Sequence, residues 1–143
     1  HGARMILRDM PSWLDRSPGF REYLEGTVLI PVPLHRRRLG KRGFNQSEWI
    51  AHSFRKAVGP SVEVMDILKR KKNTPTQTEL DRSERKVNVK NAFALKRRNR
   101  LRKEDRIMLI DDVFTTGATL NACAQVLRDH GFKRINIATL GHG

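Results

Sequence analysis

The sequence contains one cysteine, Cys123, among its 143 residues. A single cysteine excludes an intrachain disulfide framework and a zinc site built from cysteines within this sequence. No apolar run reaches the length of a membrane-spanning helix, and the first residues lack the basic and then apolar pattern of a signal peptide. These absences predict a cytoplasmic protein that does not cross a membrane.

Acidic residues are scarce as well. Asp and Glu number 15 against 29 Lys and Arg, which gives a formal net charge of +14. Such an excess attracts polyanions over a long range, so nucleic acids and phosphorylated metabolites are both candidate partners. The length suits a single domain covering residues 1–143.

The densest group of candidate functional residues lies in the stretch 107–119. This stretch contains neither a Walker loop nor a G-x-G-x-x-G motif. Four apolar residues, Ile107 to Ile110, predict a strand buried on both faces, as in a parallel sheet. Asp111 and Asp112 follow at the expected carboxyl end of that strand. Open α/β sheets bind ligands at this end, so the two aspartates are candidate binding residues.

The residues after the aspartates are small or carry hydroxyls, and they predict a turn into a helix: Thr115, Thr116, Gly117, Ala118 and Thr119. A helix start presents amide donors that suit a phosphate, and Gly117 lets the backbone approach closely. An anion site beside two carboxylates indicates a ligand with a phosphate and vicinal hydroxyls, such as a ribose 5-phosphate. The alternative is that the threonines only shape the turn and the aspartates are solvated.

Residues 107–119 resemble the phosphoribosyl pyrophosphate (PRPP) signature of type I phosphoribosyltransferases, in which apolar residues precede Asp-Asp-Val-x-Thr-Thr-Gly-x-Thr. The resemblance implies that Asp111 and Asp112 hold the 2- and 3-hydroxyls of the ribose and that residues 115–119 wrap the 5-phosphate. It also implies that Mg²⁺ accompanies PRPP, because a polyphosphorylated sugar needs a hard cation. The implied fold is α/β, with a mostly parallel twisted sheet flanked by helices.

A second apolar run, residues 27–30, is followed by Pro-Val-Pro and then by five cations within residues 36–42. This arrangement resembles the first loop of the phosphoribosyltransferase site, which receives pyrophosphate. The resemblance makes five residues candidates for pyrophosphate binding: Val32, Pro33, Arg36, Arg42 and, from a later segment, Arg85. The alternative for the basic run is a solvated face.

Three motifs in order resemble the ComF family of competence-associated proteins. They are Pro-Val-Pro at 31–33, Arg-Gly-Phe-Asn-Gln at 42–46, and Gln-x-x-Leu-x-x-x-x-Arg-x-x-Asn-x-x-x-x-Phe at 77–93. Members of that family usually carry an N-terminal zinc ribbon of Cys-x-x-Cys pairs. These 143 residues contain none, so either this sequence omits the ribbon or this member has lost it. No claim about zinc carries over, and no metal site is expected among these residues.

The resemblances leave three hypotheses open. The first is an enzyme of nucleoside metabolism that transfers phosphoribosyl from PRPP to an unidentified acceptor. The second is a protein that handles single-stranded DNA during competence and uses the PRPP pocket for binding or sensing. The third is a basic structural protein with a relic pocket.

The remaining segments predict the rest of the α/β fold. Residues 1–26 predict two short helices, or a helix and a turn, at the domain edge. A helix is expected over 47–58, and strands over 62–68, 92–95 and 134–139. His52 lies alone on the predicted helix and is interpreted as structural.

Two polar segments suggest binding roles. Residues 69–91 predict either a hood that closes over the reacting sugar or a helix over 78–86 at the sheet edge. Residues 96–106 predict a basic turn, and four of its arginines are candidates for nucleic-acid phosphates: Arg97, Arg98, Arg100 and Arg102. The stretch 69–106 has 15 cations and one aromatic residue, Phe93, so a base-stacking platform is not evident.

Overall fold

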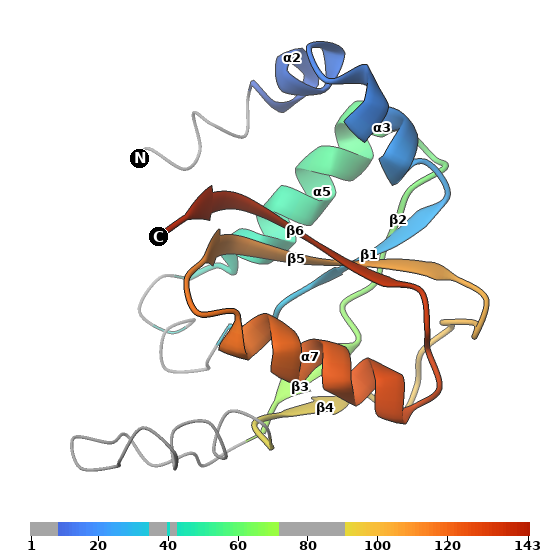
Figure 1. Ribbon diagram of the computed structural model, residues 1–143, viewed down its shortest axis with the longest axis vertical. Coiled ribbons are helices and arrows are strands. Elements are labelled where there is room, and N and C mark those ends of the chain that lie inside the picture. The colour runs from blue at the N-terminus through green and yellow to red at the C-terminus, as the bar shows by residue number, and fades with distance from the viewer. Residues whose placement is uncertain (1–8, 35–39, 41–42, 72–90) are drawn as a thin grey trace.

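The computed structural model describes residues 9–34, 40, 43–71 and 91–143 (Figure 1). Its helices are α2 (Met10–Asp15), α3 (Pro18–Leu24), α5 (Gln46–Val58) and α7 (Ala118–Asp129). Its strands are β1 (Thr27–Pro31), β2 (Glu63–Val64), β3 (Leu68–Arg70), β4 (Phe93–Leu95), β5 (Arg106–Phe114) and β6 (Ile135–His142). No helix within these residues is long and apolar enough to span a bilayer.

A parallel sheet of four strands, in the order β2-β1-β5-β6, forms the centre of the structure. Helices α2, α3 and α5 lie on one face, and α7 lies on the other together with an antiparallel pair formed by β3 and β4 (Figure 1). The expected α/β fold with a mostly parallel sheet flanked by helices is therefore confirmed.

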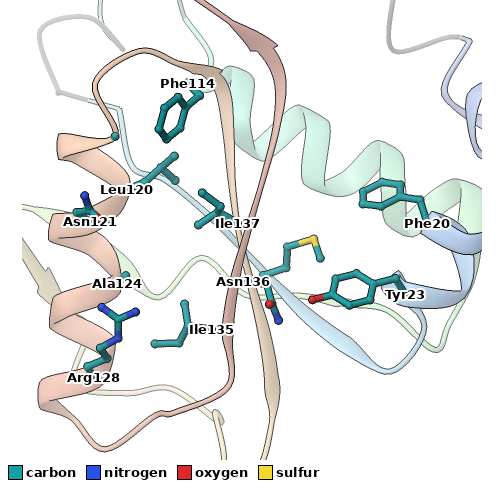
Figure 2. Close-up of a pocket in the computed structure, with 12 residues that line it drawn as sticks. Phe20, Tyr23, Phe114, Leu120, Asn121, Ala124, Arg128, Ile135, Asn136 and Ile137 are labelled. Atoms are coloured by element: carbon teal, nitrogen blue, oxygen red, sulfur yellow. The ribbon is translucent and has the colours of Figure 1, made fainter.

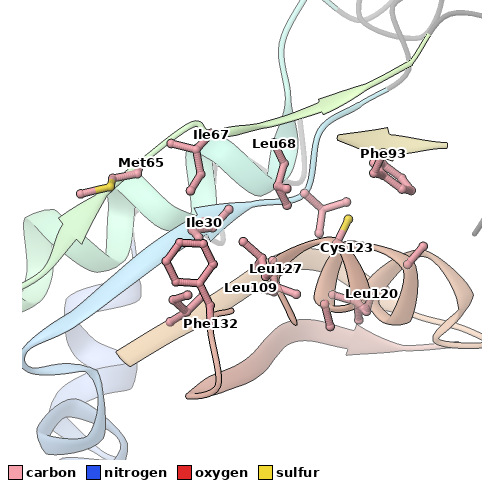
Figure 3. Close-up of a cluster of buried hydrophobic side chains, with 14 of the residues drawn as sticks. Ile30, Met65, Ile67, Leu68, Phe93, Leu109, Leu120, Cys123, Leu127 and Phe132 are labelled. Carbon is pink, nitrogen blue, oxygen red and sulfur yellow. The ribbon is translucent and has the colours of Figure 1, made fainter. Parts of the chain in front are cut away.

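Successive side chains of the two central strands point to opposite faces of the sheet, and they contribute to one hydrophobic core on each face. Ile30 and Leu109 point toward α7 and join the core in Figure 3, whereas Leu29 and Met108 point toward α5. All four side chains are essentially inaccessible to solvent. Burying a large apolar side chain stabilises a fold by about 1.5–3 kcal/mol, so uninterrupted apolar runs fix β1 and β5 at the centre.

Helix α5 has clear start and stop signals. The Asn45 side chain accepts a hydrogen bond from the Ser47 amide at 3.1 Å, which caps the first turn. Gly59, with φ of +116°, ends the helix in a conformation that favours glycine. Predictions for this helix, for two short N-terminal helices and for the strands at 92–95 and 134–139 are confirmed, within a few residues at the ends.

The single strand predicted over 62–68 is wrong. The segment divides into β2, which pairs with β1 in the main sheet, and β3, which pairs with β4. The chain bends between them, where the Met65 amide donates to the Leu29 carbonyl at 3.0 Å. The apolar pattern could not show the break, because apolar residues lie on both sides of it and the partner strands are distant in the sequence.

A pair of substitutions on adjacent strands tests this core. Leu109 and Ile137 are register partners, but Leu109 is 0% exposed and Ile137 is 49% exposed. We expect Leu109→Ala to lower the free energy of unfolding by about 2–5 kcal/mol. Ile137→Ala is the matched control and should cost less than about 1 kcal/mol. Urea denaturation measures both, and equal costs would contradict the difference in burial between these two side chains.

Candidate phosphoribosyl site at the carboxyl edge of the sheet

The strand order changes direction between β1 and β5. From β1 the chain crosses through α5 to β2, and from β5 it crosses through α7 to β6 on the other side. The two helices therefore cover opposite faces, and both begin near the carboxyl edge of the sheet, at the left in Figure 1. Ligands of open α/β sheets bind at such a switch point, so the ends of β1 and β5 define the candidate site.

Asp111 and Asp112 lie inside β5, so the expectation that they follow the strand end is wrong. β5 continues to Phe114 because β6 remains paired with it up to that residue. The pairing with β1 reaches only to Pro31, and the Val32 amide makes the backbone bond beyond it, to the Ile110 carbonyl. The aspartates thus follow immediately after β5 loses its β1 neighbour, at the switch point itself.

The carboxyl group of Asp111 is held by two donors. Its Oδ1 accepts hydrogen bonds from Ser47 Oγ at 3.0 Å and from the Asp112 amide at 2.9 Å. Burial raises the pKa of Asp111 above its ordinary value, against the lowering effect of these bonds, and the charge of Asp112 raises it further. The Asp112 carboxylate accepts from the Val113 amide at 2.9 Å. Two adjacent, oriented carboxylates are suited to vicinal hydroxyls.

The turn after β5 presents amides at the start of α7. The first intrahelical bond runs from the Asn121 amide to the Gly117 carbonyl at 2.8 Å, so the amides of 117–120 have no carbonyl partner within the helix. Thr116 Oγ1 accepts from the Ala118 amide at 3.4 Å. Gly117 has φ of +72°, and a Cβ there would lie 3.0 Å from the Phe114 ring. The turn therefore requires glycine, and it has the amide and hydroxyl donors that a phosphate needs.

The segment that leaves β1 is anchored at its first residue. The Val32 amide donates to the Ile110 carbonyl at 2.9 Å, and the Val32 carbonyl accepts from Asn45 Nδ2 at 3.0 Å. Pro33 has no amide, so neither residue offers a backbone donor to pyrophosphate in this arrangement. Their part in binding pyrophosphate stays a prediction.

The cationic part of the predicted pyrophosphate site lies outside the described residues. This holds for Arg36, Arg42 and Arg85, and for residues 72–90 of the segment predicted as a hood or a helix. Their roles stay predictions.

A protein-family comparison decides the family. The model of the phosphoribosyl transferase domain matches residues 41–142, a span that includes α5, β5 and α7. Both aspartates and the turn at 115–119 lie within it. The chain belongs to the phosphoribosyl transferase domain family.

Curated relatives of this phosphoribosyltransferase domain agree with the resemblance drawn from its three motifs. Competence protein F of Haemophilus influenzae is 37% identical over 111 residues, which are 77% of this chain and 48% of that protein. The DNA utilization protein YhgH of Escherichia coli K12 is 36% identical over 110 residues, 76% of this chain and 46% of that protein. The chain spans about half the length of these relatives.

A solved structure supports the fold of the phosphoribosyltransferase domain. A hypoxanthine phosphoribosyltransferase from Staphylococcus aureus superimposes with a TM-score of 0.57, covering 95% of this chain and 64% of its own. The two sequences are 12% identical, so the likeness concerns the fold alone.

Cys123 of α7 and Arg70 of β3 lie near Asp111, and neither was expected there. Burial raises the pKa of the Cys123 thiol to about 12, and the charge of Asp111 adds to the effect while Arg70 opposes it. The Arg70 guanidinium also stacks over the Phe93 ring, 5.4 Å from its centroid. The thiol is therefore buried and unreactive.

Metal-binding groups are sparse in the part of the domain that the structure describes. It contains no group of three or more His, Cys, Asp or Glu side chains placed to hold a metal ion. Mg²⁺ is commonly held by one or two carboxylates together with waters and substrate phosphate oxygens, so Asp111 and Asp112 can supply part of such a ligand set. The expectation of Mg²⁺ with PRPP stays a prediction.

The basic turn before β5 lies at the opposite edge of the sheet from the aspartates. Its candidate residues, Arg97, Arg98, Arg100 and Arg102, are all exposed. Two of them form surface ion pairs, Arg100 with Glu63 at 3.4 Å and Arg102 with Asp105 at 3.3 Å. From the start of β5 to Asp111 the distance along the strand is about 17 Å, at about 3.3 Å per residue. The structure thus separates the two predicted binding regions.

A pocket of about 480 Å³ that the sequence did not indicate lies beside the outer strand β6 (Figure 2). Tyr23 from α3, Arg128 from α7 and Asn136 from β6 line it, and Gly117 places it behind the phosphate turn. Neither aspartate lines it. This pocket is therefore separate from the carboxylate pair.

A pair of glycine-to-alanine substitutions tests the geometry of the turn at 115–119. We expect Gly117→Ala to cost about 1–3 kcal/mol of stability, because its backbone is left-handed and the added Cβ meets Phe114. Gly19→Ala is the matched control, since it lies in α3 with open space around it, and it should be neutral or stabilising. Thermal and urea unfolding measure both. A Gly117 variant as stable as the Gly19 variant would refute the turn geometry.

Proposed function

We propose that this domain binds PRPP at the carboxyl edge of the sheet. Asp111 and Asp112 accept hydrogen bonds from the ribose hydroxyls, and the turn at 115–119 binds the 5-phosphate through amides and threonine hydroxyls. The observation that carries the proposal is the placement of the carboxylate pair and the amide-rich turn together, at the switch point between β1 and β5. The membership of the phosphoribosyl transferase domain family supports it.

The pyrophosphate group of PRPP would lie on the β1 side of the aspartates. Val32 and Pro33 form the start of that loop, and Arg36, Arg42 and Arg85 are proposed to neutralise the diphosphate. Mg²⁺ enters with the substrate, bound mainly by the oxygens of PRPP.

The proposed reaction is phosphoribosyl transfer. The bond between ribose C1 and the pyrophosphate oxygen breaks, a nucleophilic atom of the acceptor bonds to C1, and the acceptor loses a proton. The chain contributes mainly positioning and charge: the aspartates fix the ribose, and the arginines stabilise the leaving group. The acceptor is unidentified.

Calorimetric titration of Mg²⁺·PRPP tests the binding site. We expect wild type to bind and Asp111→Asn/Asp112→Asn to lose more than about 100-fold in affinity, because two charge-assisted hydrogen bonds to the ribose are weakened. The control is Asp15→Asn/Asp129→Asn, which makes the same charge change at two exposed positions and should bind as wild type does.

Two results would contradict the proposal. If wild type does not bind PRPP, the proposed PRPP site is wrong. If the double variant binds PRPP normally, the two aspartates do not take part in binding. Pyrophosphate release in the presence of an acceptor pool then tests catalysis. Tight binding without release on any acceptor would favour a binding or sensing role over an enzyme.

The exposed basic turn favours a second candidate function, which is binding of single-stranded DNA. Its arginines lie apart from the aspartates, so a DNA strand and PRPP could be bound together. The similarity to a protein named for DNA utilization supports this candidate. Phosphate contacts of this kind are insensitive to sequence and strongly dependent on salt.

Fluorescence anisotropy with a labelled oligonucleotide tests the basic turn. Replacing Arg97, Arg98, Arg100 and Arg102 by Ala should weaken binding and lower the salt slope by up to about 3, at about 0.7 per lost phosphate contact. The control replaces four exposed cations elsewhere, Arg16, Arg55, Arg128 and Lys133. Equal effects of the two variants would indicate net charge alone, and unchanged affinity would exclude this surface.

A further inference from the structure

A chain of hydrogen bonds connects the end of β1 with the aspartates. Asn45 lies at its centre: its Nδ2 donates to the Val32 carbonyl at 3.0 Å, and its Oδ1 accepts from the Ser47 amide at 3.1 Å. Ser47 Oγ then donates to Asp111 Oδ1 at 3.0 Å, across 64 positions of sequence. The first turn of α5 thus links the loop proposed for pyrophosphate to the carboxylate proposed for the ribose.

The contact between Ser47 and Asp111 is enclosed. Ser47 is 4% exposed, and in the described part of the chain only Thr27 is a comparably buried polar residue. A buried hydroxyl whose hydrogen bond is removed costs stability, so the bond to Asp111 fixes the direction in which Ser47 donates. The capping bond from Asn45 holds the Ser47 backbone in place, so the hydroxyl reaches Asp111 from a rigid position.

Both donors to Asp111 converge on one oxygen. Ser47 Oγ and the Asp112 amide donate to Oδ1, and neither of them donates to Oδ2. A carboxylate fixed through one oxygen keeps the other for a ligand hydroxyl in a defined direction. This is the arrangement that recognition of one ribose hydroxyl requires.

The surroundings of Asp111 oppose its ionisation, so the two donors matter for its pKa. Burial and the neighbouring Asp112 raise its pKa, while the Asp112 amide and the Ser47 hydroxyl lower it. Among the described residues, Cys123 on α7 interacts electrostatically with Asp111 and with Arg70 on β3. The Asp112 amide belongs to the backbone of the strand, so in the described part of the chain Ser47 is the side chain that favours the ionised form of Asp111.

We propose that Ser47 is a positioning residue for PRPP, which orients the Asp111 carboxylate toward the ribose and, through Asn45, couples it to the loop after β1. This inference rests on the proposed PRPP site and deepens it. It also gives a physical role to the Asn of the Arg-Gly-Phe-Asn-Gln motif, which the sequence marked without explaining.

Two measurements on Ser47→Ala and Ser47→Thr test the proposal. Carbon-13 NMR follows the titration of the Asp111 carboxyl in the ligand-free protein, with its signal assigned from Asp111→Asn. Calorimetry follows the binding of Mg²⁺·PRPP. We expect Ser47→Ala to raise the pKa of Asp111 and to weaken PRPP binding about tenfold, as for the loss of one hydrogen bond to a charged group. Ser47→Thr should restore both, since it keeps the hydroxyl.

Ser53→Ala is the matched control. Ser53 lies on the same helix, and its hydroxyl donates to the Trp49 carbonyl at 2.8 Å, away from the aspartates. It should leave the pKa of Asp111 and the affinity for PRPP unchanged.

The outcomes separate this proposal from the proposed function. An unchanged pKa of Asp111 in Ser47→Ala overturns the positioning role, whatever the affinity for PRPP. A raised pKa with normal PRPP binding also overturns it. If wild type does not bind PRPP but the pKa rises in Ser47→Ala, the proposed function fails while the orientation of Asp111 by Ser47 stands.

Discussion

The parallel pairing of β1 with β5 is the constraint on which the rest of the structure depends. Both strands are buried on both faces, and their pairing ends at Pro31 and Ile110. The segment after β1 therefore leaves the sheet beside Asp111 and Asp112, which are distant in the sequence and lie on the adjacent strand β5. Since α5 and α7 return along opposite faces, their first turns reach the same edge from both sides. One backbone register thus assembles four segments around a single point.

This arrangement places the Asp111 carboxyl group in a partly buried position, where burial disfavours its ionised form. The raised pKa of Asp111 means that the folded state binds a proton more tightly than the unfolded chain does. Its contribution to stability is complete below the unfolded pKa and is lost as the pH rises through the folded value, so the ionised form is a cost near neutrality. The apolar cores on both faces of the sheet offset this cost. A local loss of stability of this kind is typical of residues retained for binding.

The sequence identified the elements whose signals are local, and it failed where partners are distant. Apolar runs located β1 and β5, and an apolar helical face that stops at Gly59-Pro60 located α5. The division of 62–68 into two strands depends on pairing with β1 and β4, which periodicity does not record. The extension of β5 past its apolar core depends on β6 in the same way. In the site, Asp111 and Gly117 were identified from a compact motif, whereas the hydrogen bond from Ser47 joins residues that only the fold brings together.

The burial of Cys123 gives this protein a built-in reporter. It is the only thiol in the sequence, it lies on the inner face of α7, and Asp111 is close enough to influence its ionisation. A thiol reagent can reach it only when α7 separates locally from the sheet, so the rate of labelling measures how often the helix and its preceding turn open. A ligand bound at that turn would slow the labelling without touching the sulfur. The native sequence can therefore report on motion at its own binding site without an added probe.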